Sequence, residues 1–327
     1  MSSPIMKAIV VENGGASLAW RDVPRPEPQD DEVLVRVHAT ALNRADLLQR
    51  AGLYPVPPGA SPILGLEVAG EIVELGHGVE DVYVGDRVCA LLDGGGYAEY
   101  VCVPSGMLLH LPEHIPMAEA AAVPEVFYTA YLNLYLEGEL TAGESALIHA
   151  GSSGVGTAAI QICRHFGNRV YVTTSASKID ALRRFEPTRI IDRERERFVD
   201  VLRELGGVDV ILDPVGGGYL ADNLTILNKR GRLVLIGLLG GVSAELPLAR
   251  LLMNRQRIIG SVLRSRSRKE KIEITRRIAE RIWPAICDGR LYAVIDREYS
   301  ILEADSAHAH MRSNSAVGKI VLNVPRD

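Results

Sequence analysis

The sequence predicts an α/β fold in which a doubly wound parallel sheet is accompanied by a mostly antiparallel, barrel-like β domain. Three observations support this. The first 120 or so residues contain short β-branched runs separated by turns. From about residue 123, apolar strands alternate with helical patterns. Within that second part, a strand runs directly into a glycine-rich loop and a helix. A chain of 327 residues is long enough for two domains.

The first part is predicted to be a β domain because its apolar runs are short and rich in β-branched residues. The expected strands are residues 6–11, 32–39, 68–76, 86–92 and 97–103. Proline- and glycine-rich segments separate them, as is typical of turns and loops, at residues 24–32, 54–62 and 92–97.

The second part is predicted to be a parallel sheet with helices on both faces, because strands alternate with amphipathic helices. The expected strands are residues 146–150, 169–174, 208–213, 232–237 and 257–263. A helical stretch over 268–287 and a closing strand over 319–324 complete the chain.

Composition and charge exclude several classes of protein. The net charge of −5 gives no overall attraction to nucleic acid or anionic membranes. The N-terminal segment "MSSPIMKAIVVENGG" lacks the pattern of a signal peptide, and no run of 18 apolar residues occurs, so we expect a cytoplasmic protein without a membrane span. No C-x-x-C pair occurs, so neither a zinc ribbon nor a redox dithiol is expected from the cysteines, Cys89, Cys102, Cys163 and Cys287.

The segment "ALIHAGSSGVGTAAIQICRHFG" predicts a dinucleotide-binding loop. Gly151 permits a tight turn, Ser153 lets the backbone approach a pyrophosphate, and Gly156 allows the helix to pack against the strand. Gly154 and Val155 lie between them, where free N–H groups at the helix start face the phosphates. A G-x-S-x-x-G pattern alone is weak, but its position between a strand and a helix strengthens it.

The end of the next strand favours NADP(H) over NAD. An NAD site usually has an acidic residue there to bind the ribose 2′-hydroxyl, but no carboxylate occurs before Asp180. Ser175 offers a hydroxyl, and Lys178 and Arg193 offer positive charges for a 2′-phosphate. Each of the two cations has a simpler alternative as a solvated surface residue.

Two further segments are candidates for ligand contact. "IGLLGG" follows a strand, and its Gly237, Leu238 and Leu239 are expected near the nicotinamide. The basic run 264–271 offers charges that suit phosphate, although a solvated helix start beside the sheet explains it better.

The motifs "ALNRADLLQRAGLY", "PILGLEVAGEIVELG", "GGGYAEY", "HAGSSGVG", "LRSR" and "GKIVL" resemble the zinc-free NADPH:quinone oxidoreductase branch of the medium-chain dehydrogenase/reductase superfamily. The resemblance spans nearly the whole chain. It implies a GroES-like catalytic domain made of residues 1–124 and 266–327, and an NADP-binding Rossmann domain of residues 125–265. It also implies a homodimer joined through the strand at 257–263.

The resemblance also locates the positions at which relatives bind catalytic zinc through Cys, His and Cys. Here they hold Asn43, Leu66 and Glu125, so no tetrahedral zinc site is expected. Asp46 and Glu67 are then expected to be buried hydrogen-bond partners.

Without a Lewis acid, the expected substrate is one that accepts hydride readily, such as a quinone or conjugated enone. Asn43 is predicted to bind the acceptor carbonyl or the nicotinamide ribose, and Tyr54 to stack on a planar acceptor. Simpler alternatives are an Asn that holds a turn and a Tyr that packs the loop. Thr129, Leu263 and Arg264 are expected around the cofactor. Two other functions stay open: reduction of enoyl thioesters, and an NADPH-binding structural or nucleic-acid-binding role.

Overall fold

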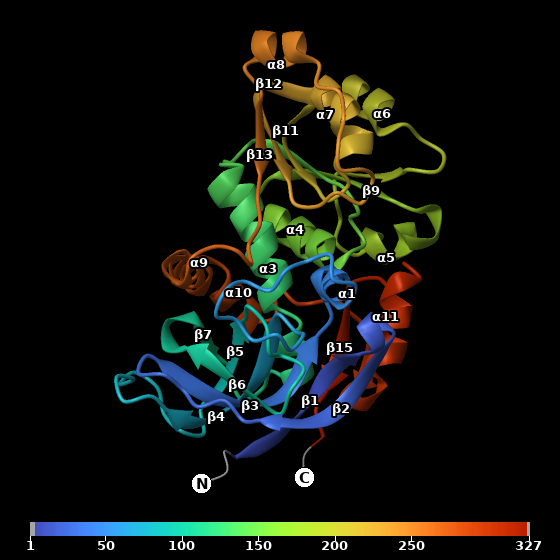
Figure 1. Cartoon of the computed structure of the whole chain (residues 1–327). Coiled ribbons are helices and arrows are strands. Elements are labelled where there is room, and N and C mark those ends of the chain that lie inside the picture. Colours follow the sequence, from blue (N-terminus) through green and yellow to red (C-terminus); the bar gives the residue numbers. More distant parts are fainter. Residues whose placement is uncertain (1–3, 326–327) are drawn as a thin grey trace. The chain divides into compact units, whose positions relative to one another are not determined.

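A computed structural model describes residues 4–325 of the chain (Figure 1). The first three residues of the segment used to exclude a signal peptide lie outside this range. The chain divides into two compact units: the first extends up to Tyr128 and resumes at Arg264, and the second spans Thr129–Leu263. The sequence analysis places these borders at 124/125 and 265/266. The chain passes from the first unit to the second within α3 (Pro124–Tyr131).

The main sheet of the first unit is centred on β3 (Glu32–Ala41), nine of whose ten residues are buried. β3 pairs antiparallel with β4 (Glu67–Leu75) on one side and with β15 (Lys319–Asn323) on the other. The last strand of the chain therefore lies beside one of the first. This pairing brings the end of β3, the start of β4 and the start of β15 to one edge of the sheet.

The rest of the first unit extends this sheet and covers it. The strand order is β14-β15-β3-β4-β5-β7, β6 also pairs with β3, and β1 and β2 form a separate hairpin. The short helix α2 packs against β3 and β4. The other elements are β1 (Ile5–Glu12), β2 (Ser17–Pro24), β5 (Arg87–Leu91), β6 (Tyr100–Pro104), β7 (Leu108–His110), β14 (Ile295–Ser300), α1 (Arg44–Arg50), α2 (Met117–Ala121), α9 (Arg268–Arg281), α10 (Trp283–Cys287) and α11 (Ala304–Arg312).

The second unit is a six-stranded, wholly parallel sheet with the order β10-β9-β8-β11-β12-β13. The strand order reverses between β8 and β11, which is where ligands bind in open α/β sheets. Its elements are β8 (Ser145–Ile148), β9 (Arg169–Thr174), β10 (Arg189–Asp192), β11 (Val208–Asp213), β12 (Leu227–Leu235), β13 (Arg257–Gly260), α4 (Gly154–His165), α5 (Ile179–Arg183), α6 (Phe198–Glu204), α7 (Leu220–Ile226) and α8 (Leu248–Asn254).

The predicted fold class is confirmed: a wholly parallel, doubly wound sheet is combined with a mostly antiparallel β unit. The predicted helix over 268–287 is in fact two helices, α9 and α10, that meet at Ile282. Pro284 lies in the first turn of α10 and has no backbone N–H to continue a helix from before it. The sequence analysis did not foresee β2, β14 or α11.

None of the helices within residues 4–325 combines the length and hydrophobicity that a membrane crossing requires.

Candidate active site

A buried lysine ammonium lies at the sheet edge where β3, β4 and β15 meet. Lys319 is 3% exposed, and its Nζ donates to the Leu42 carbonyl at 2.6 Å, to Asn43 Oδ1 at 2.6 Å and to Glu67 Oε1 at 2.7 Å. An ammonium group has three donors, so all three protons are used. We call Lys319, Asn43 and Glu67 the ammonium cluster.

The ammonium cluster fixes the Asn43 amide. Asn43 Nδ2 donates to Glu67 Oε1 at 2.9 Å and to the Ala41 carbonyl at 3.3 Å, while Oδ1 accepts from Lys319. The Asn43 backbone N–H donates to Asp46 Oδ2 at 2.8 Å, which closes the first turn of α1. Both amide protons therefore have acceptors within the unit. This geometry favours the alternative in which Asn43 holds a turn, and a direct role toward ligand stays a prediction.

Asp46 connects the ammonium cluster to a second buried layer. Its carboxylate accepts from the Gly65 N–H at 3.2 Å and from the Tyr97 hydroxyl at 3.1 Å, and the same hydroxyl lies 3.3 Å from His308 Nε2. Burial raises the pKa of Asp46 to about 6 and lowers the pKa of His308 to about 3. The neutral His308 imidazole thus contacts the Tyr97 hydroxyl, and this hydroxyl donates to Asp46. The expectation that Asp46 and Glu67 are buried hydrogen-bond partners agrees with these contacts.

Glu125 adds a second carboxyl beside Glu67. The Glu125 backbone N–H donates to Glu67 Oε2 at 2.9 Å, at the start of α3. Burial, and then the negative charge of Glu67, raise the pKa of the Glu125 carboxyl to about 8, against the pull of Lys319. The Glu125 side chain is therefore mostly protonated at neutral pH, and it is partly exposed.

These residues do not fit a catalytic zinc ion. Leu66, at the position of the zinc-binding histidine, is buried and has no ligand atom, and the ammonium cluster is a hydrogen-bonded cation site without sulfur or imidazole donors. Within the described part of the chain, no three His, Cys, Asp or Glu side chains are arranged to hold a metal.

A second cluster contains Tyr54 and Arg264. The Arg264 Nε donates to the Asp93 carbonyl at 2.8 Å, and its guanidinium carbon lies 5.2 Å from the centroid of the Tyr54 ring. Lys271 pairs with the Asp93 carboxylate and donates to the Arg264 carbonyl at 2.7 Å. Burial raises the pKa of the Tyr54 phenol, so it stays a hydrogen-bond donor at physiological pH. The structure thus brings Tyr54 and Arg264, both predicted from the sequence, into contact.

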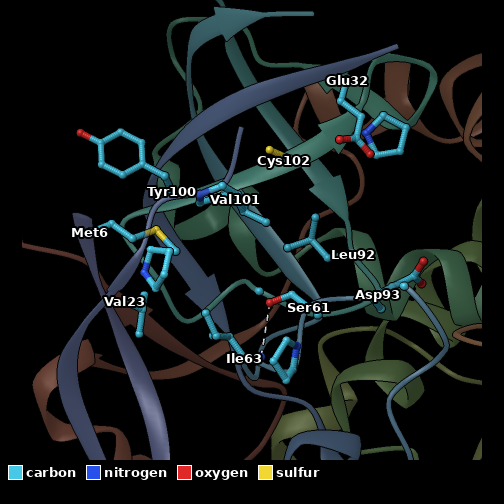
Figure 2. A pocket seen from close by; sticks show the side chains of 18 of the residues that line it. Met6, Val23, Glu32, Ser61, Ile63, Leu92, Asp93, Tyr100, Val101 and Cys102 are labelled. Carbon is cyan, nitrogen blue, oxygen red and sulfur yellow. Dashed lines mark hydrogen bonds between the residues drawn. The ribbon is translucent and has the colours of Figure 1, made fainter. Parts of the chain in front are cut away.

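The first unit also has a pocket of about 800 Å³, whose lining includes Asp93, the partner of Arg264 and Lys271 (Figure 2). Apolar side chains line most of it, among them Met6, Val23, Ile63 and Leu92, and the Ser61 hydroxyl accepts from the Ile63 N–H at 3.3 Å. None of the site residues predicted from the sequence lines this pocket.

In the second unit, the glycine loop between β8 and α4 forms a tight turn that leads into a capped helix. Ser153 caps α4 by accepting the Gly156 N–H at 3.0 Å, and Gly151 donates to the Thr173 carbonyl at 2.9 Å. A Cβ atom on Gly156 would lie 2.5 Å from the Ala150 carbonyl oxygen, so only glycine fits there. The start of α4, with Gly154 and Val155, offers its N–H groups at the switch point of the sheet.

The residues that directly follow β9 along the chain include no carboxylate that could bind a ribose hydroxyl. Thr174 ends β9, and its carbonyl accepts from the Arg193 N–H at 3.0 Å, which holds Arg193 next to Ser175. Lys178 follows in the same short turn and is partly exposed. The nearest carboxylate along the chain, Asp180, is solvent-exposed and pairs with an arginine of its own helix. Ser175 and Lys178 thus follow this strand along the chain, while Asp192 of the neighbouring strand β10 lies in register with Thr174.

A buried histidine behind the glycine loop was missed by the sequence analysis. His149 Nε2 lies 2.8 Å from Asn223 Oδ1, and His149 Nδ1 lies 3.0 Å from Thr173 Oγ1. Asn223 Nδ2 donates to Asp213 Oδ2 at 2.9 Å, and Asp213 Oδ1 accepts the Val215 N–H at 2.6 Å. Burial lowers the pKa of His149 to about 4, so the imidazole is neutral. This chain of bonds connects the residue after β8 to β9, to α7 and to the end of β11.

The other residues of the second unit that were predicted to contact the cofactor form fewer side-chain hydrogen bonds with described residues than His149 does. Gly237 lies against Pro214, where a Cβ would come within 2.8 Å of a carbonyl oxygen, while Leu238 and Leu239 are more than half exposed, at 51% and 63%. The Thr129 carbonyl accepts from Asn133 Nδ2 at 2.7 Å. The last predicted residue of this unit, Leu263, is buried.

Comparison with known proteins gives similarity along the whole chain. Residues 29–113 match the family described as alcohol dehydrogenase GroES-like domain, and residues 154–280 match the family described as zinc-binding dehydrogenase. The synaptic vesicle membrane protein VAT-1 homolog of Rattus norvegicus is 32% identical over 341 residues, covering 98% of this chain and 84% of the relative.

Two solved structures of reductases are similar to this chain in fold. The quinone oxidoreductase from Coxiella burnetii has a TM-score of 0.80 and 28% sequence identity, covering 98% of this chain and 100% of that chain. The CurK enoyl reductase has a TM-score of 0.84 and 27% identity, covering 98% and 99%.

Proposed function

Because the chain belongs to the medium-chain dehydrogenase/reductase superfamily and fits its zinc-free, quinone oxidoreductase-like branch, we propose that it is an NADPH-dependent reductase of quinones or similar conjugated carbonyl compounds. The observation that supports this most directly is the ammonium cluster. A lysine whose three protons are all bonded lies among the residues that replace zinc ligands. Such a site offers no Lewis acid to activate an alcohol, which favours a substrate that accepts hydride readily.

The bound cofactor would supply the hydride. The start of α4, with Gly151 and Ser153, would hold the pyrophosphate, and Ser175, Lys178 and Arg193 would hold the 2′-phosphate. The neutral His149 would hold the segments around that site in place through its hydrogen bonds. Thr129, Gly237, Leu238, Leu239 and Leu263 are proposed to contact the nicotinamide end.

Reduction of the C=C bond of an enone or enoyl thioester is the second candidate, and the similarity to an enoyl reductase favours it. Both reactions place negative charge on a carbonyl oxygen of the acceptor, so the same residues serve either. The third possibility, an NADPH-binding protein with a structural or nucleic-acid-binding role, has less support because the net charge of −5 does not attract nucleic acid.

We propose that the protein is cytoplasmic and forms a homodimer through β13. This strand ends the parallel sheet and, within residues 4–325, pairs with β12 alone. Beside it in sequence, α8 exposes Leu248, Leu252 and Met253 at 66%, 75% and 74%. Apolar exposure of this kind beside an open strand edge is typical of a buried interface. Sedimentation equilibrium should give a dimer for the wild type and a monomer for Leu252→Glu.

NADPH oxidation tests the proposed function. The acceptors are 1,4-benzoquinone, 9,10-phenanthrenequinone and crotonyl-CoA, each with NADPH or NADH and with or without EDTA. We expect NADPH-dependent turnover of the quinones that EDTA does not change. Tight NADPH binding without turnover of any acceptor would favour the non-enzymatic role, and loss of turnover in EDTA would contradict a metal-free reaction.

A further inference from the structure

Arg264 is buried, at 5% exposure, yet most of its guanidinium group has no hydrogen-bond partner. Its Nε donates to the Asp93 carbonyl, but Nη1 and Nη2 have no partner among the described residues. A buried charged donor without an acceptor destabilises a fold, because it loses its bonds to water without gaining others. Such a group is expected where a ligand supplies the missing acceptor.

The position of this guanidinium is fixed by its neighbours. Lys271, which is 2% exposed, holds both the Asp93 carboxylate and the Arg264 carbonyl, so the two backbone segments are tied together. The Tyr54 ring lies 5.2 Å from the guanidinium carbon, within the range of a cation–π contact. An aromatic face beside two free N–H donors suits a flat, conjugated ligand with an anionic oxygen.

Glu125 offers a proton donor for such a ligand. Both Glu125 and Arg264 lie close enough to shift the pKa of the Tyr54 phenol. No described residue forms a hydrogen bond with the Glu125 carboxyl, whose backbone N–H alone is anchored, to Glu67. The carboxyl is thus partly exposed, has no hydrogen-bond partner among the described residues, and interacts electrostatically with both Tyr54 and Arg264.

We propose that Arg264 and Glu125 form an oxyanion subsite for the acceptor, in which the two Nη groups bind the oxygen that becomes negatively charged and Glu125 protonates it. This inference rests on the proposed reductase function. When the acceptor gains a hydride, the electron pair of its carbonyl π bond, or of the conjugated system, moves onto that oxygen. The O–H bond of Glu125 then breaks, its proton passes to the oxygen of the phenolate or enolate, and water reprotonates the carboxylate.

The charges around Glu125 agree with the role of an acid. The Glu67 and Asp46 carboxylates raise its pKa and the Lys319 and Arg264 cations lower it, while burial has the largest effect. The result, a pKa of about 8, keeps the proton available at neutral pH.

Binding of 4-nitrophenol tests the subsite without turnover, because its phenolate imitates the anionic product and absorbs visible light. We would titrate it into the complex with NADP⁺, which cannot donate hydride, and follow the phenolate band from pH 5 to 9. The expected result is a lower apparent pKa for bound 4-nitrophenol than for the free compound. Arg264→Met should remove that shift and weaken phenolate binding by about tenfold or more, and Arg264→Lys should have an intermediate effect.

Two further variants separate the parts of the proposal. Glu125→Gln keeps hydrogen-bond donors, so it should retain phenolate binding but lower kcat by about a hundredfold or more. Arg266→Met is the matched control, because that arginine pairs with Glu270 instead, and its phenolate binding should equal that of the wild type. Thermal unfolding confirms that each variant is folded.

The failures of the two proposals are distinguishable. Phenolate binding in Arg264→Met equal to that of the wild type, or a kcat of Glu125→Gln within a few-fold of the wild type, would overturn the oxyanion subsite. If no quinone or enone is reduced while phenolate binding still depends on Arg264, the reductase function fails and the anion-binding part of the inference stands.

Discussion

Replacing Lys319 by methionine tests whether the ammonium cluster determines the stability of the first unit. Lys319→Met keeps much of the side-chain volume and removes only the charge and its three hydrogen bonds. Glu67, which is fully buried at 0% exposure, then keeps only two donors, Asn43 Nδ2 and the Glu125 N–H. The Leu42 carbonyl and Asn43 Oδ1 each lose a bond as well.

The magnitude follows from the buried, unpaired carboxylate. Removing one partner of a buried ion pair typically lowers the free energy of unfolding by about 3–5 kcal/mol. A domain is commonly stable by only about 5–15 kcal/mol, so this loss is a large fraction of the total. The double variant Glu67→Gln/Lys319→Met contains no unpaired charge. We therefore expect it to be more stable than Lys319→Met alone, with a coupling free energy of about 2 kcal/mol or more.

Tryptophan fluorescence during urea unfolding is the appropriate assay. The chain has two tryptophans, Trp20 and Trp283, and both lie in the first unit. Their fluorescence therefore reports on that unit even if the two units unfold separately. Lys269→Met, on α9, is the control for removal of an exposed lysine and should change the midpoint little. If Lys319→Met costs less than about 1 kcal/mol, or if the double variant is simply additive, the ammonium does not compensate Glu67 and the reasoning is refuted.

Three other predictions follow from the two units. Lys178→Glu should weaken NADPH binding by about tenfold or more and leave NADH binding nearly unchanged; equal effects on both cofactors would remove Lys178 from the 2′-phosphate site. With quinone as acceptor, kcat should fall as the pH rises through about 8, where Glu125 loses its proton, and this limb should be absent in Glu125→Gln. His149 has a folded pKa of about 4, below its ordinary value of 6.5, so its contribution to stability is complete above pH 6.5 and is lost as the pH falls toward 4. The stability difference between the wild type and His149→Gln, measured by hydrogen exchange in β8, should therefore narrow over that interval; a constant difference would contradict a buried neutral imidazole.

The cofactor loop was predictable because its chemistry is local. Gly151, Ser153 and Gly156 are close in sequence, and their spacing reflects steric limits that a single strand–loop–helix unit imposes. The fold class was predictable for a similar reason, since alternating strands and helices produce a periodic pattern. The missed hairpin strand β2 has no buried residue and no clear alternation, so its pattern carried little information.

The ammonium cluster was not predictable from the residues themselves, because its members come from opposite ends of the chain. Lys319 reaches Asn43 and Glu67 only because β15 pairs with β3, and that pairing leaves no local signal in the sequence. His149 was missed for a different reason. A histidine beside a glycine loop has no periodicity to identify it, and its partners Thr173 and Asn223 follow from the order of the parallel strands.

Because all three protons of the Lys319 ammonium are bonded within the protein, another group must polarise the proposed acceptor. A catalytic metal keeps an open coordination position for the substrate oxygen, but an ammonium with three protein acceptors has none. Lys319 therefore supplies positive charge to Glu67 and Asn43 but no Lewis acidity. Any positive group that acts on the acceptor must have donors to spare, and in the first unit Arg264 is a buried cation with two guanidinium nitrogens that lack partners. The two cations thus have different proposed roles: Lys319 stabilises the fold and Arg264 binds the ligand. For this reason Lys319→Met should mainly affect stability, and Arg264→Met should mainly affect anion binding.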